Sequence, residues 1–490
     1  MLWTLQTATR PAGRRSSRRD PSEATVATAH FTSSVDVEAL RHAIRGSVLA
    51  PGDEGWDEAR TPWNVAFDQQ PALIVVPANS ADVQAVVRFA LANGLRLAPQ
   101  GTGHGVASLG DVSDAVLVRM HKLRDVEIDV EAGQIRVGAG AIWDDAVTPA
   151  AEHGFAVLHG SSPDVGVAGY TLGGGMGWLA RKHGLAANSL TAIELVTADG
   201  EFHRVDHTHE RDLFFALRGG GGNFGIVTAF EYKLFPLETV FAGWLIWPWE
   251  QSERVLSAWR DWTETTPDEV TSIARILQLP PIELIPEPLR GRNIVVVEVA
   301  YAGDEESGRE LIAPLLQFQP ELSTLATMPA AGLVRLHNDP EHPTPAIGDG
   351  AILEHLPDEA IRALVEVSGP GSGSPFLSVE LRQLGGALGR QAPYAGAVSH
   401  LEGDFLLFSF GLPLTPELAQ AQEQHLDRMA ETVAPWRAEQ NYLNFAERAV
   451  DSETFYPGTN HDRLREIRER FDPHELFRAN HRIQPAGFDW

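Results

Sequence analysis

The pattern of apolar and polar positions predicts alternating strands and helices in the first part of the chain. Residues 72–76 (ALIVV) are a continuous apolar run typical of a buried strand, and residues 95–98 (LRLA) predict a second strand. Between them, apolar positions recur with helical spacing, from a cap at Ser80 to a stop at Gly94. In open α/β folds a ligand binds where such strands end, so a ligand site is expected just after residue 98.

Further patterns predict hairpins and a separate second unit. Alternating apolar and polar residues flank Ala132-Gly133 and Asp199-Gly200, so each pair predicts the turn of a β-hairpin. An amphipathic segment near the start predicts a short helix with Ser34 as its N-cap and Gly46 as its end. After residue 237, strands in series with interspersed helices favour an antiparallel sheet covered by helices on one face. The strands are 241–249, 293–303, 376–386 and 405–412, and the helices are 307–318 and 415–433.

Composition excludes several classes of function. The chain has 490 residues, 43% of them hydrophobic, which is enough for two large domains with ordinary cores. Lys plus Arg number 39 and Asp plus Glu number 66, and the resulting net charge of −27 disfavours nucleic acids and anionic membranes as partners. There is no cysteine, so disulfides, cysteine-ligated metals and thiol nucleophiles are excluded. No histidine spacing matches a zinc signature, and no metal is predicted.

Residues 1–33 predict a disordered basic tail. Five arginines and no acidic residue occur within the first 19 positions, and four of these arginines form the run RRSSRR. The run is similar to a twin-arginine export signal, but such a signal requires an apolar segment that does not follow here. We expect a cytoplasmic protein, with export left open.

Three glycine-rich loops carry the clearest chemical signal. They are GTGHG at 101–105, VGVAGYTLGGGMGWLARKHGL at 165–185 and RGGGGNFGIVT at 218–228. Glycine tolerates positive φ and lets a ligand approach the backbone, whose N–H groups then bind phosphate oxygens. The spacings fit neither the Rossmann fingerprint nor the P-loop. Three such loops, each beside a strand or helix, therefore predict a dinucleotide held by several loops at once.

These segments resemble one known family. The match runs from residue 71 to 236 and resumes in NYLNFAE at 441–447 and RFDPHELFRANHRI at 470–483, with VELRQLGGA at 379–387 similar to a substrate-domain strand. In this order they resemble the berberine-bridge-enzyme-like FAD-linked oxidases of the vanillyl-alcohol-oxidase superfamily. The resemblance implies an α+β fold with a PCMH-type FAD-binding domain and an antiparallel-sheet substrate domain covered by helices. The expected boundaries are 34–236 for the FAD-binding domain, 237–440 for the substrate domain and 441–490 for a segment that returns to the FAD-binding domain.

The resemblance also assigns roles within the loops. His104 lies where the family's histidine is bonded to the flavin 8α-methyl carbon, which implies a covalent histidyl link to FAD. Ser162 stands where many relatives carry a second, cysteinyl tether, so one link is expected and no cysteinyl link. Val165 lies at the position associated with oxygen access, where a small side chain is typical of oxidases. The predicted cofactor-binding residues are His104, Gln100, Gly101, Thr102, Gly103, Gly105, Ser162, Val165, Gly166, Gly169, Gly173, Gly174, Gly175, Gly177, Gly184, Leu185, Asn188, Gly225, Ile226, Val227, Tyr442, Asn444 and Asn480.

Tyr442 is the candidate catalytic residue. By resemblance it lies over the flavin, where it either takes the substrate proton as a base or packs on the flavin and orients the substrate. A free tyrosine has a pKa of about 10, so the base role requires a nearby cation, for which Arg382 is the candidate. Asn444 would share a face with Tyr442 if this segment is a strand. Relatives often carry another tyrosine inside the second glycine loop, and this chain has Met176 there.

The expected function is therefore FAD-dependent oxidation of a small molecule. An alcohol, sugar or amine-type carbon would be oxidised, with O2 as electron acceptor, and tailoring of secondary metabolites is one expectation from the fold-level analogy. Glu380 and Gln383 alternate on a predicted strand of the substrate domain, so one of them is expected to face the substrate. Two alternatives stay open: a dehydrogenase that uses another electron acceptor, and a protein that binds flavin without turnover.

Overall fold

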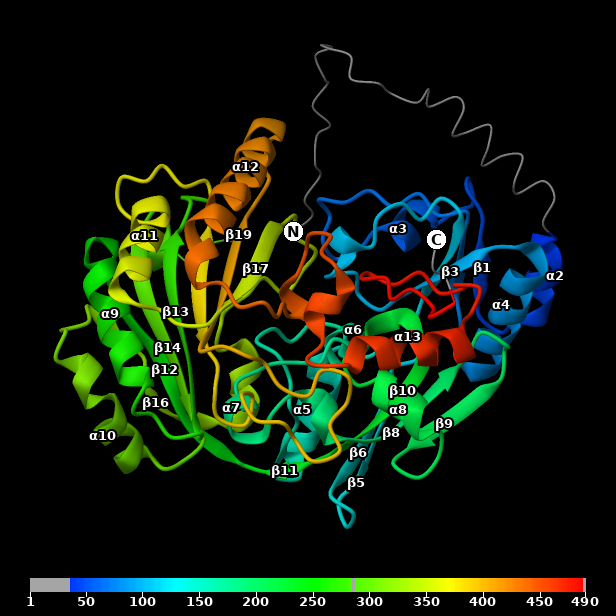
Figure 1. The fold of residues 1–490 in the computed structure, drawn as a ribbon, viewed down its shortest axis with the longest axis horizontal. Helices are drawn as coiled ribbons and strands as arrows, with labels where there is room; N and C mark the ends of the chain where they lie inside the picture. The colour runs from blue at the N-terminus through cyan, green and yellow to red at the C-terminus, as the bar shows by residue number, and fades with distance from the viewer. Residues whose placement is uncertain (1–35, 284, 286, 488–490) are drawn as a thin grey trace.

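The computed structural model describes residues 36–283, 285 and 287–487, and it forms two units that lie side by side (Figure 1). The predicted basic tail and Ser34 lie outside the described residues. The first helix, α2 (Val37–Ala43), begins after Asp36, whose carboxylate accepts a hydrogen bond from the backbone of Ala39. The predicted end at Gly46 is wrong, because the chain is already extended at Ile44 as it approaches the first strand.

The first sheet contains the predicted strand–helix–strand unit. Its order is β1–β2–β4–β3, with β2, β4 and β3 parallel and β1 antiparallel. The helix α4 begins one residue later than its cap, which is Asn79 rather than Ser80, and it ends at Gly94 with a φ of 64° as predicted. The first glycine loop follows the end of β3. These elements are β1 (Ser47–Leu49), β2 (Leu73–Val76), α4 (Ser80–Asn93), β3 (Arg96–Gln100) and β4 (Ala115–Arg119).

A second, five-stranded sheet completes the first unit. Its order is β5–β6–β10–β8–β9, and every pairing is antiparallel. The two predicted hairpins are confirmed, since β5 pairs with β6 across Ala132-Gly133 and β8 pairs with β9 across Asp199-Gly200. The strands are β5 (Val126–Asp129), β6 (Gln134–Gly138), β8 (Leu190–Val196), β9 (Phe202–Asp206) and β10 (Ile226–Lys233).

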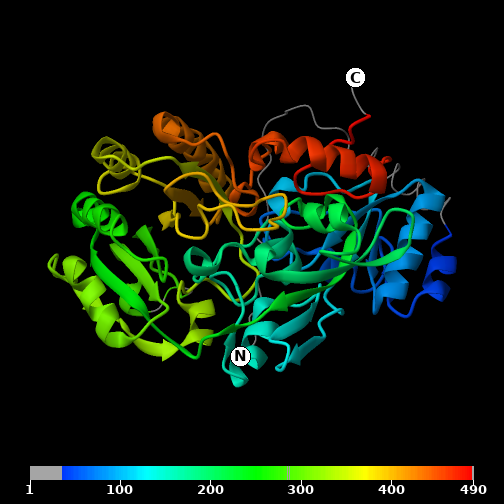
Figure 2. The ribbon, with the colours of Figure 1, turned by 60° about the horizontal axis from the view of Figure 1, so that its bottom comes forward.

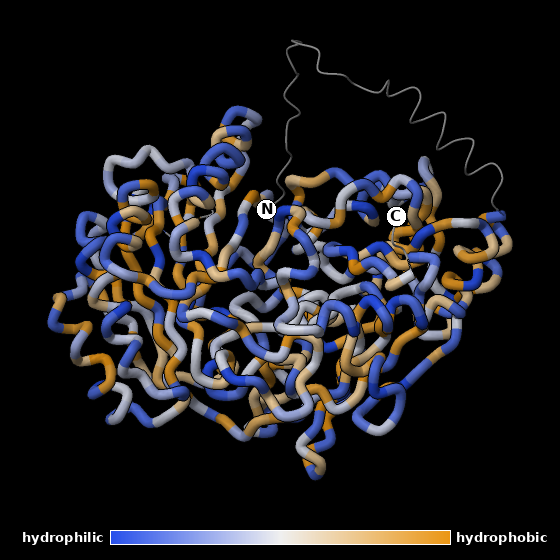
Figure 3. The backbone as a smooth tube through the Cα atoms, in the orientation of Figure 1, coloured by the Kyte–Doolittle hydropathy of each residue, from blue (hydrophilic) through white to orange (hydrophobic). Residues whose placement is uncertain are grey.

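The second unit is one large antiparallel sheet with helices on its outer face (Figure 1). The strand order is β15–β12–β14–β13–β18–β19–β17, and β16 also pairs with β12. The expected helix-covered antiparallel sheet is confirmed, and the covering helices carry both hydrophobic and hydrophilic positions (Figure 3). The elements are β12 (Thr239–Pro248), α9 (Ser252–Thr263), β13 (Val270–Gln278), β14 (Asn293–Tyr301), α10 (Glu305–Leu316), β15 (Leu322–Ser323), β16 (Ala326–Pro329), β17 (Ile347–Leu353), α11 (Asp358–Ser368), β18 (Ser378–Gln383), β19 (Phe405–Gly411) and α12 (Pro416–Val433).

Six of these elements were not predicted from the sequence pattern: α9, β13, β15, β16, β17 and α11. The central strand β13 shows the reason, because both of its faces are buried and it carries Ser272 and Arg275 inside the fold. Buried polar residues remove the alternation by which a half-exposed strand is recognised.

The C-terminal segment returns to the first unit. Helix α13 (Asn460–Phe471), red in Figure 2, lies against that unit, where Arg463 pairs with Asp212 of α8 at 2.9 Å. The Leu97 N–H of β3 donates to Leu476 at 2.8 Å, and Leu97 forms a parallel bridge with Phe477. The remaining elements are α3 (Trp56–Arg60), α5 (Trp143–Glu152), β7 (Phe155–Ala156), α6 (Val167–Leu172), α7 (Ala180–His183), α8 (Arg211–Ala216), β11 (Phe235–Pro236) and the 3-10 turns η6 (Ala330–Arg335) and η8 (Leu443–Phe445).

Apolar side chains from both units meet at their junction. Leu158 and Trp178 of the first unit pack in one cluster with Ile273 and Ala300 of the large sheet. This cluster identifies the inner face of the large sheet as the face turned toward the glycine loops. No helix in the described ranges is long and apolar enough to span a bilayer.

Candidate functional site

His104 follows the end of β3, and three side chains hold its ring. The Trp63 indole stacks on the imidazole with ring centroids 4.0 Å apart and an interplanar angle of 18°. The Thr102 hydroxyl oxygen lies 2.7 Å from Nδ1, and Oδ1 of Asp164 lies 3.6 Å from Nε2. The ring therefore has a fixed plane and a different polar partner at each nitrogen.

Asp164 is itself held in place by two donors. The Ser162 hydroxyl donates to Oδ1 at 2.9 Å, and the Trp63 indole N–H donates to Oδ2 at 2.5 Å. Burial raises the pKa of Asp164, but the interactions with His104, Trp63 and Ser162 outweigh burial and hold the pKa below its ordinary value. Asp164 is thus a carboxylate at neutral pH, and the Ser162 hydroxyl is engaged with it.

The backbone of the first glycine loop has unused donors. Among the residues that the structure describes, the N–H groups of positions 102–105 donate no hydrogen bond. Gly103 has a φ of 90°, and an added Cβ there would lie 2.7 Å from the Pro62 side chain, so glycine is required. An added Cβ at Gly101 would meet no heavy atom within 4 Å. Consecutive unpaired amides beside open space are a typical site for phosphate oxygens.

The second glycine loop packs against the first loop and against the C-terminal segment. An added Cβ at Gly166 would lie 3.2 Å from the Thr102 hydroxyl oxygen, and one at Gly173 would overlap the side chain of Asn444. Segments from residues 102, 166 and 444 therefore converge, although they are distant in the sequence. Five further predicted glycines lie in this loop: Gly169, Gly174, Gly175, Gly177 and Gly184.

The C-terminal segment also fixes the third glycine loop. The Asn223 side-chain amide donates to the His481 carbonyl at 3.0 Å, and Arg468 donates to the Asn223 carbonyl. Asn480, a predicted cofactor residue, donates to the carbonyl of Gly105 and so links this segment to the first loop. Three predicted residues have side chains in the hydrophobic core, which leaves only their backbone groups available to a ligand: Leu185, Ile226 and Val227.

Tyr442 and Asn444 lie beside the second glycine loop. Asn444 belongs to the 3-10 turn η8 and not to a strand, so the expected shared strand face is wrong. The Asn444 side-chain amide still lies 3.4 Å from the Tyr442 hydroxyl, and it donates to the Tyr170 carbonyl at 2.9 Å. Burial raises the pKa of Tyr442 well above its ordinary value, although Gly175, Arg382 and Asn444 act in the opposite direction. Tyr442 is therefore a neutral phenol at rest.

Tyr170 is a second phenol that the sequence analysis missed. Its ring occupies space left by Gly175 of the loop and by Gly160, which precedes the loop, because an added Cβ at either position would meet the ring. Its hydroxyl oxygen is buried and has no hydrogen-bond partner among the described residues. Burial, and then the nearby Tyr442, raise its pKa well above the ordinary value. The signal for this phenol in the sequence is the position of Tyr170 between Gly169 and the run Gly173–Gly175.

Arg382 lies near Tyr442, with one aromatic ring between them. The Arg382 guanidinium lies 4.8 Å from the centroid of the Phe445 ring, and Phe445 stacks on Tyr442 with centroids 5.8 Å apart. Its positive charge lowers the pKa of Tyr442, but burial has the larger effect. The cation that the base hypothesis requires is thus close, yet it does not ionise the resting phenol.

Arg382 ends a row of five buried charged side chains, which we call the charged row. Its members follow in the order Arg275, Glu298, His337, Glu380 and Arg382. Successive contacts measure 2.8 Å from Arg275 to Glu298, 2.5 Å from Glu298 to Nδ1 of His337, 3.1 Å from Nε2 of His337 to Glu380, and 2.7 Å from Glu380 to Arg382. None of the five is more than 9% exposed.

The charged row lies on the inner face of the large sheet and alternates in sign. Strand register pairs Ile273, a junction residue, with both Glu298 and Arg382, which places all three on one face. Burial and Arg275 lower the pKa of His337, but Glu298, Asp339 and Glu380 outweigh them and raise it to about 9. His337 is therefore a cation at neutral pH, as the alternation requires.

The structure distinguishes the two candidate polar residues of β18. Glu380 belongs to the charged row on the inner face, whereas Gln383 accepts from Ser272 and donates to Thr266 on the opposite, helix-covered side. Burial raises the pKa of Glu380, but the charges of Arg382, His337 and Arg275 have the larger effect and hold the pKa well below its ordinary value. Glu380 therefore stays ionised, and the opposite charges offset the free-energy cost of burying it.

The site fits FAD on the evidence of its unpaired groups. In the described part of the chain, the Tyr170 hydroxyl and Oδ1 of Asn188 are buried and lack hydrogen-bond partners. Buried polar atoms are rarely left unpaired, so a ligand is the ordinary explanation for such a group of atoms. The unused amides of residues 102–105 suit a diphosphate, and the buried polar side chains suit a polar ring system. We find no set of three His, Asp or Glu residues that could hold a metal in the described ranges.

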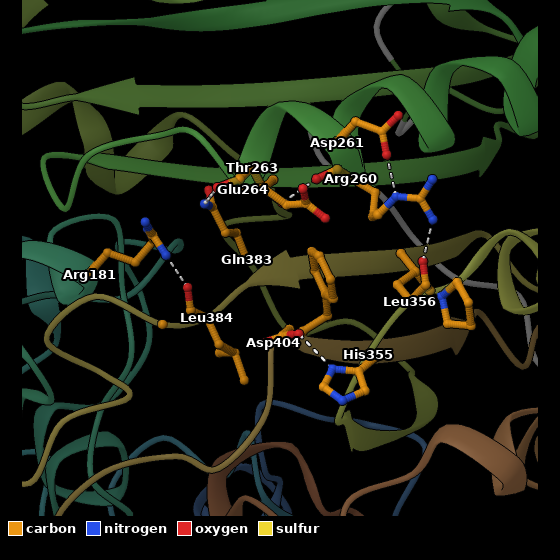
Figure 4. Close-up of a pocket in the computed structure, with 13 residues that line it drawn as sticks. Arg181, Arg260, Asp261, Thr263, Glu264, His355, Leu356, Gln383, Leu384 and Asp404 are labelled. Carbon is orange, nitrogen blue, oxygen red and sulfur yellow. Dashed lines mark hydrogen bonds and ion pairs between the residues drawn. The ribbon is translucent and has the colours of Figure 1, made fainter.

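A separate surface hollow of about 500 Å³ opens near the ends of β18 and α9 (Figure 4). Its polar groups already have partners: His355 pairs with Asp404 at 2.9 Å, and Arg260 donates to the Leu356 carbonyl at 2.7 Å. Arg181, which Figure 4 shows reaching toward Leu384, donates to the carbonyl there and ties α7 of the first unit to the large sheet. This hollow contains none of the predicted cofactor residues.

Comparisons with known proteins agree with this geometry. A family described as "FAD binding domain" matches residues 71–206, and one described as "Berberine and berberine like" matches residues 441–484. An FAD-linked oxidoreductase of Bacillus subtilis, YvdP, is 28% identical over 474 residues, covering 90% of this chain and 99% of that protein. Chitooligosaccharide oxidase of Gibberella zeae is 27% identical over 476 residues, covering 89% of this chain and 92% of that protein.

A solved structure shows the same fold over nearly the whole chain. Glucooligosaccharide oxidase from Acremonium strictum has a TM-score of 0.80 at 23% identity, covering 92% of this chain and 100% of that chain. The FAD-binding match includes the first two loops up to residue 206, and the berberine-like match includes Tyr442, Asn444 and Asn480, which the fold brings to these loops. The protein is therefore an FAD-dependent oxidoreductase, and it is similar to the berberine-bridge-enzyme-like proteins in both matched segments and in fold.

Proposed function

We propose that this FAD-dependent oxidoreductase is an oxidase with a single histidyl link to its flavin. It oxidises an alcohol, sugar or amine-type carbon of a small molecule and passes the electrons to O2, which yields hydrogen peroxide. One observation carries the proposal: an imidazole, His104, is held in a fixed plane within a loop whose backbone amides are unpaired.

The sequence limits the number of covalent links. The glucooligosaccharide oxidase of similar fold carries a 6-S-cysteinyl, 8α-N1-histidyl FAD. This chain contains no cysteine, and Ser162 donates its hydroxyl hydrogen to Asp164. A hydroxyl cannot form the thioether, so His104 is the tether that remains.

The chain's own groups bind and orient the substrate beside the flavin. FAD, when bound, supplies the acceptor for the hydride that leaves the substrate carbon. The Tyr442 oxygen already accepts from the Asn444 side-chain amide, so its own hydrogen is available to a substrate oxygen or nitrogen. Because burial keeps the phenol neutral, Tyr442 acts at rest as a hydrogen-bond donor that orients the substrate. The sequence left open whether Tyr442 acts as a base or orients the substrate, and the neutral phenol favours the second role.

Two further features support an oxidase of small polar molecules. Val165 is only partly buried and packs on the core at the start of the second loop, and a small side chain at this position is what we expect of an oxidase. Chitooligosaccharide oxidase, a relative over nearly the full length of the chain, is named for oxidation of a sugar. An alcohol carbon of a carbohydrate is therefore the first substrate class to test, followed by amines.

The experiment has two arms. The mass of the denatured protein should exceed the sequence mass by one FAD, and His104→Ala should remove that adduct while FAD still copurifies. Oligosaccharides, simple alcohols and amines are then screened anaerobically for bleaching of the flavin, and active compounds are assayed for O2 consumption. A parent protein without the adduct refutes the histidyl link, and rapid bleaching followed by slow reoxidation in air refutes the oxidase.

A further inference from the structure

We propose that Asp164 is a positioning residue for covalent attachment of FAD: it holds the imidazole proton of His104 on Nε2, so that Nδ1 presents the lone pair that bonds to the flavin carbon. This inference rests on the histidyl link proposed above. It goes further by naming the side chain that selects the reacting nitrogen.

The two partners of the His104 ring are chemically different, which decides the tautomer. Asp164 is a carboxylate with no hydrogen to give, and it lies 3.6 Å from Nε2. The Thr102 hydroxyl lies 2.7 Å from Nδ1 and can donate or accept. Both contacts are attractive only when the proton is on Nε2, because a lone pair on Nε2 would face the negatively charged carboxylate of Asp164. Nδ1 then accepts from Thr102, whose hydroxyl hydrogen can rotate away and release the lone pair.

Neighbouring side chains fix both the ring and the carboxylate. The Trp63 indole lies parallel to the imidazole, and the same indole donates its N–H to Asp164. A second donor, Ser162, holds the other carboxylate oxygen. The carboxylate therefore cannot turn away without losing two hydrogen bonds, and the imidazole cannot tilt without losing its stacking partner.

The charge produced by attachment explains why a carboxylate is placed here. One C–H bond of the flavin 8α-methyl group breaks, and a bond forms between that carbon and Nδ1, with the nitrogen lone pair as its electron pair. The proton and two electrons of the broken bond, with one proton from solvent, reduce O2 to hydrogen peroxide. His104 keeps its Nε2 proton and becomes a cation. Asp164 stabilises this cation through charge, and Trp63 stabilises it through its ring face.

The test compares Asp164→Asn with Asp144→Asn. Asparagine keeps the shape of the side chain but removes its charge, whereas Asp144 is a nearby carboxylate that pairs with Arg335 at the surface. Each full-length protein is produced under riboflavin limitation, mixed with FAD in air, and sampled for adduct mass over time. We expect attachment in Asp164→Asn to be slower by about tenfold or more, and attachment in Asp144→Asn to match the parent.

A second readout separates positioning from a general structural effect. The flavin-bearing peptide of the parent, isolated after proteolysis, should be linked through Nδ1 as determined by NMR, and the slow product of Asp164→Asn should include the Nε2 isomer or remain unattached. The inference is overturned if the parent is linked to FAD through Nε2. It is also overturned if Asp164→Asn attaches FAD at the rate of the parent and through the same nitrogen. If the parent forms no adduct at all, the histidyl link of the proposed function has failed instead.

Discussion

The stability of the second unit, which contains the large sheet, should depend on the charge of His337. In the charged row this imidazole lies between Glu298 and Glu380, and its pKa is raised from 6.5 to about 9. A difference of one pKa unit is equivalent to about 1.36 kcal/mol, so the protonated form of His337 contributes about 3 kcal/mol to folding. The stabilisation is complete below pH 6.5 and is lost as the pH rises through 9, because the pKa is higher in the folded state.

The perturbation is His337→Gln, which removes the cation and leaves two carboxylates facing each other. At pH 6 the variant should therefore be less stable than the parent by about 3 kcal/mol, or by about 6–12 °C in the unfolding midpoint of a unit of this size. At pH 10 the parent imidazole is neutral as well, and the difference should become small. Thermal unfolding followed by tryptophan fluorescence at one scan rate measures both values.

A matched control uses a buried histidine that is not charged. His425 donates from Nε2 to the Val367 carbonyl at 2.9 Å, and burial lowers its pKa. Since His425 is neutral throughout the range from pH 7 to 10, His425→Gln should shift the midpoint by a constant amount there. Other groups that titrate near pH 10 are shared with the parent and cancel in each difference. A pH-independent difference for His337→Gln would refute the assignment of a buried cation.

Three further predictions concern the flavin site. Gly173→Ala should reproduce Asn444→Ala, because the added methyl group displaces the Asn444 side chain. In the His104→Ala background, where FAD can dissociate, both variants should weaken FAD binding about fivefold for each lost hydrogen bond of about 1 kcal/mol, and unchanged binding by Gly173→Ala would contradict the overlap. Tyr442→Phe should slow anaerobic flavin reduction by a substrate about 100-fold through loss of an orienting hydrogen bond, as followed by stopped-flow absorbance, and an unchanged rate would exclude that role. Val165→Leu should slow reoxidation of the reduced protein by O2 and leave flavin reduction unchanged, and equal reoxidation rates would remove this side chain from the path of oxygen.

The pieces of the fold that depend on local pattern could be predicted from the sequence. The hairpins at Ala132-Gly133 and Asp199-Gly200, the end of α4 at Gly94 and the helix-covered antiparallel sheet all follow from turn residues and hydrophobic period. Helix starts were less predictable, because Asp36 and Asn79 cap where Ser34 and Ser80 were expected. Several adjacent residues can serve as caps, and only backbone geometry selects one of them.

The sequence by itself predicted an FAD site built from glycine-rich loops around His104, and it excluded a cysteinyl tether. Glycine loops, the absence of cysteine and the position of His104 are local facts that no packing arrangement alters. Tertiary structure alone decided what surrounds that histidine: Trp63 and Asp164 reach it from other parts of the chain. The charged row likewise arises from strand register, which aligns side chains from β13, β14 and β18 on one face. A contact between distant segments depends on how the whole sheet packs, and so no short pattern of residues encodes it.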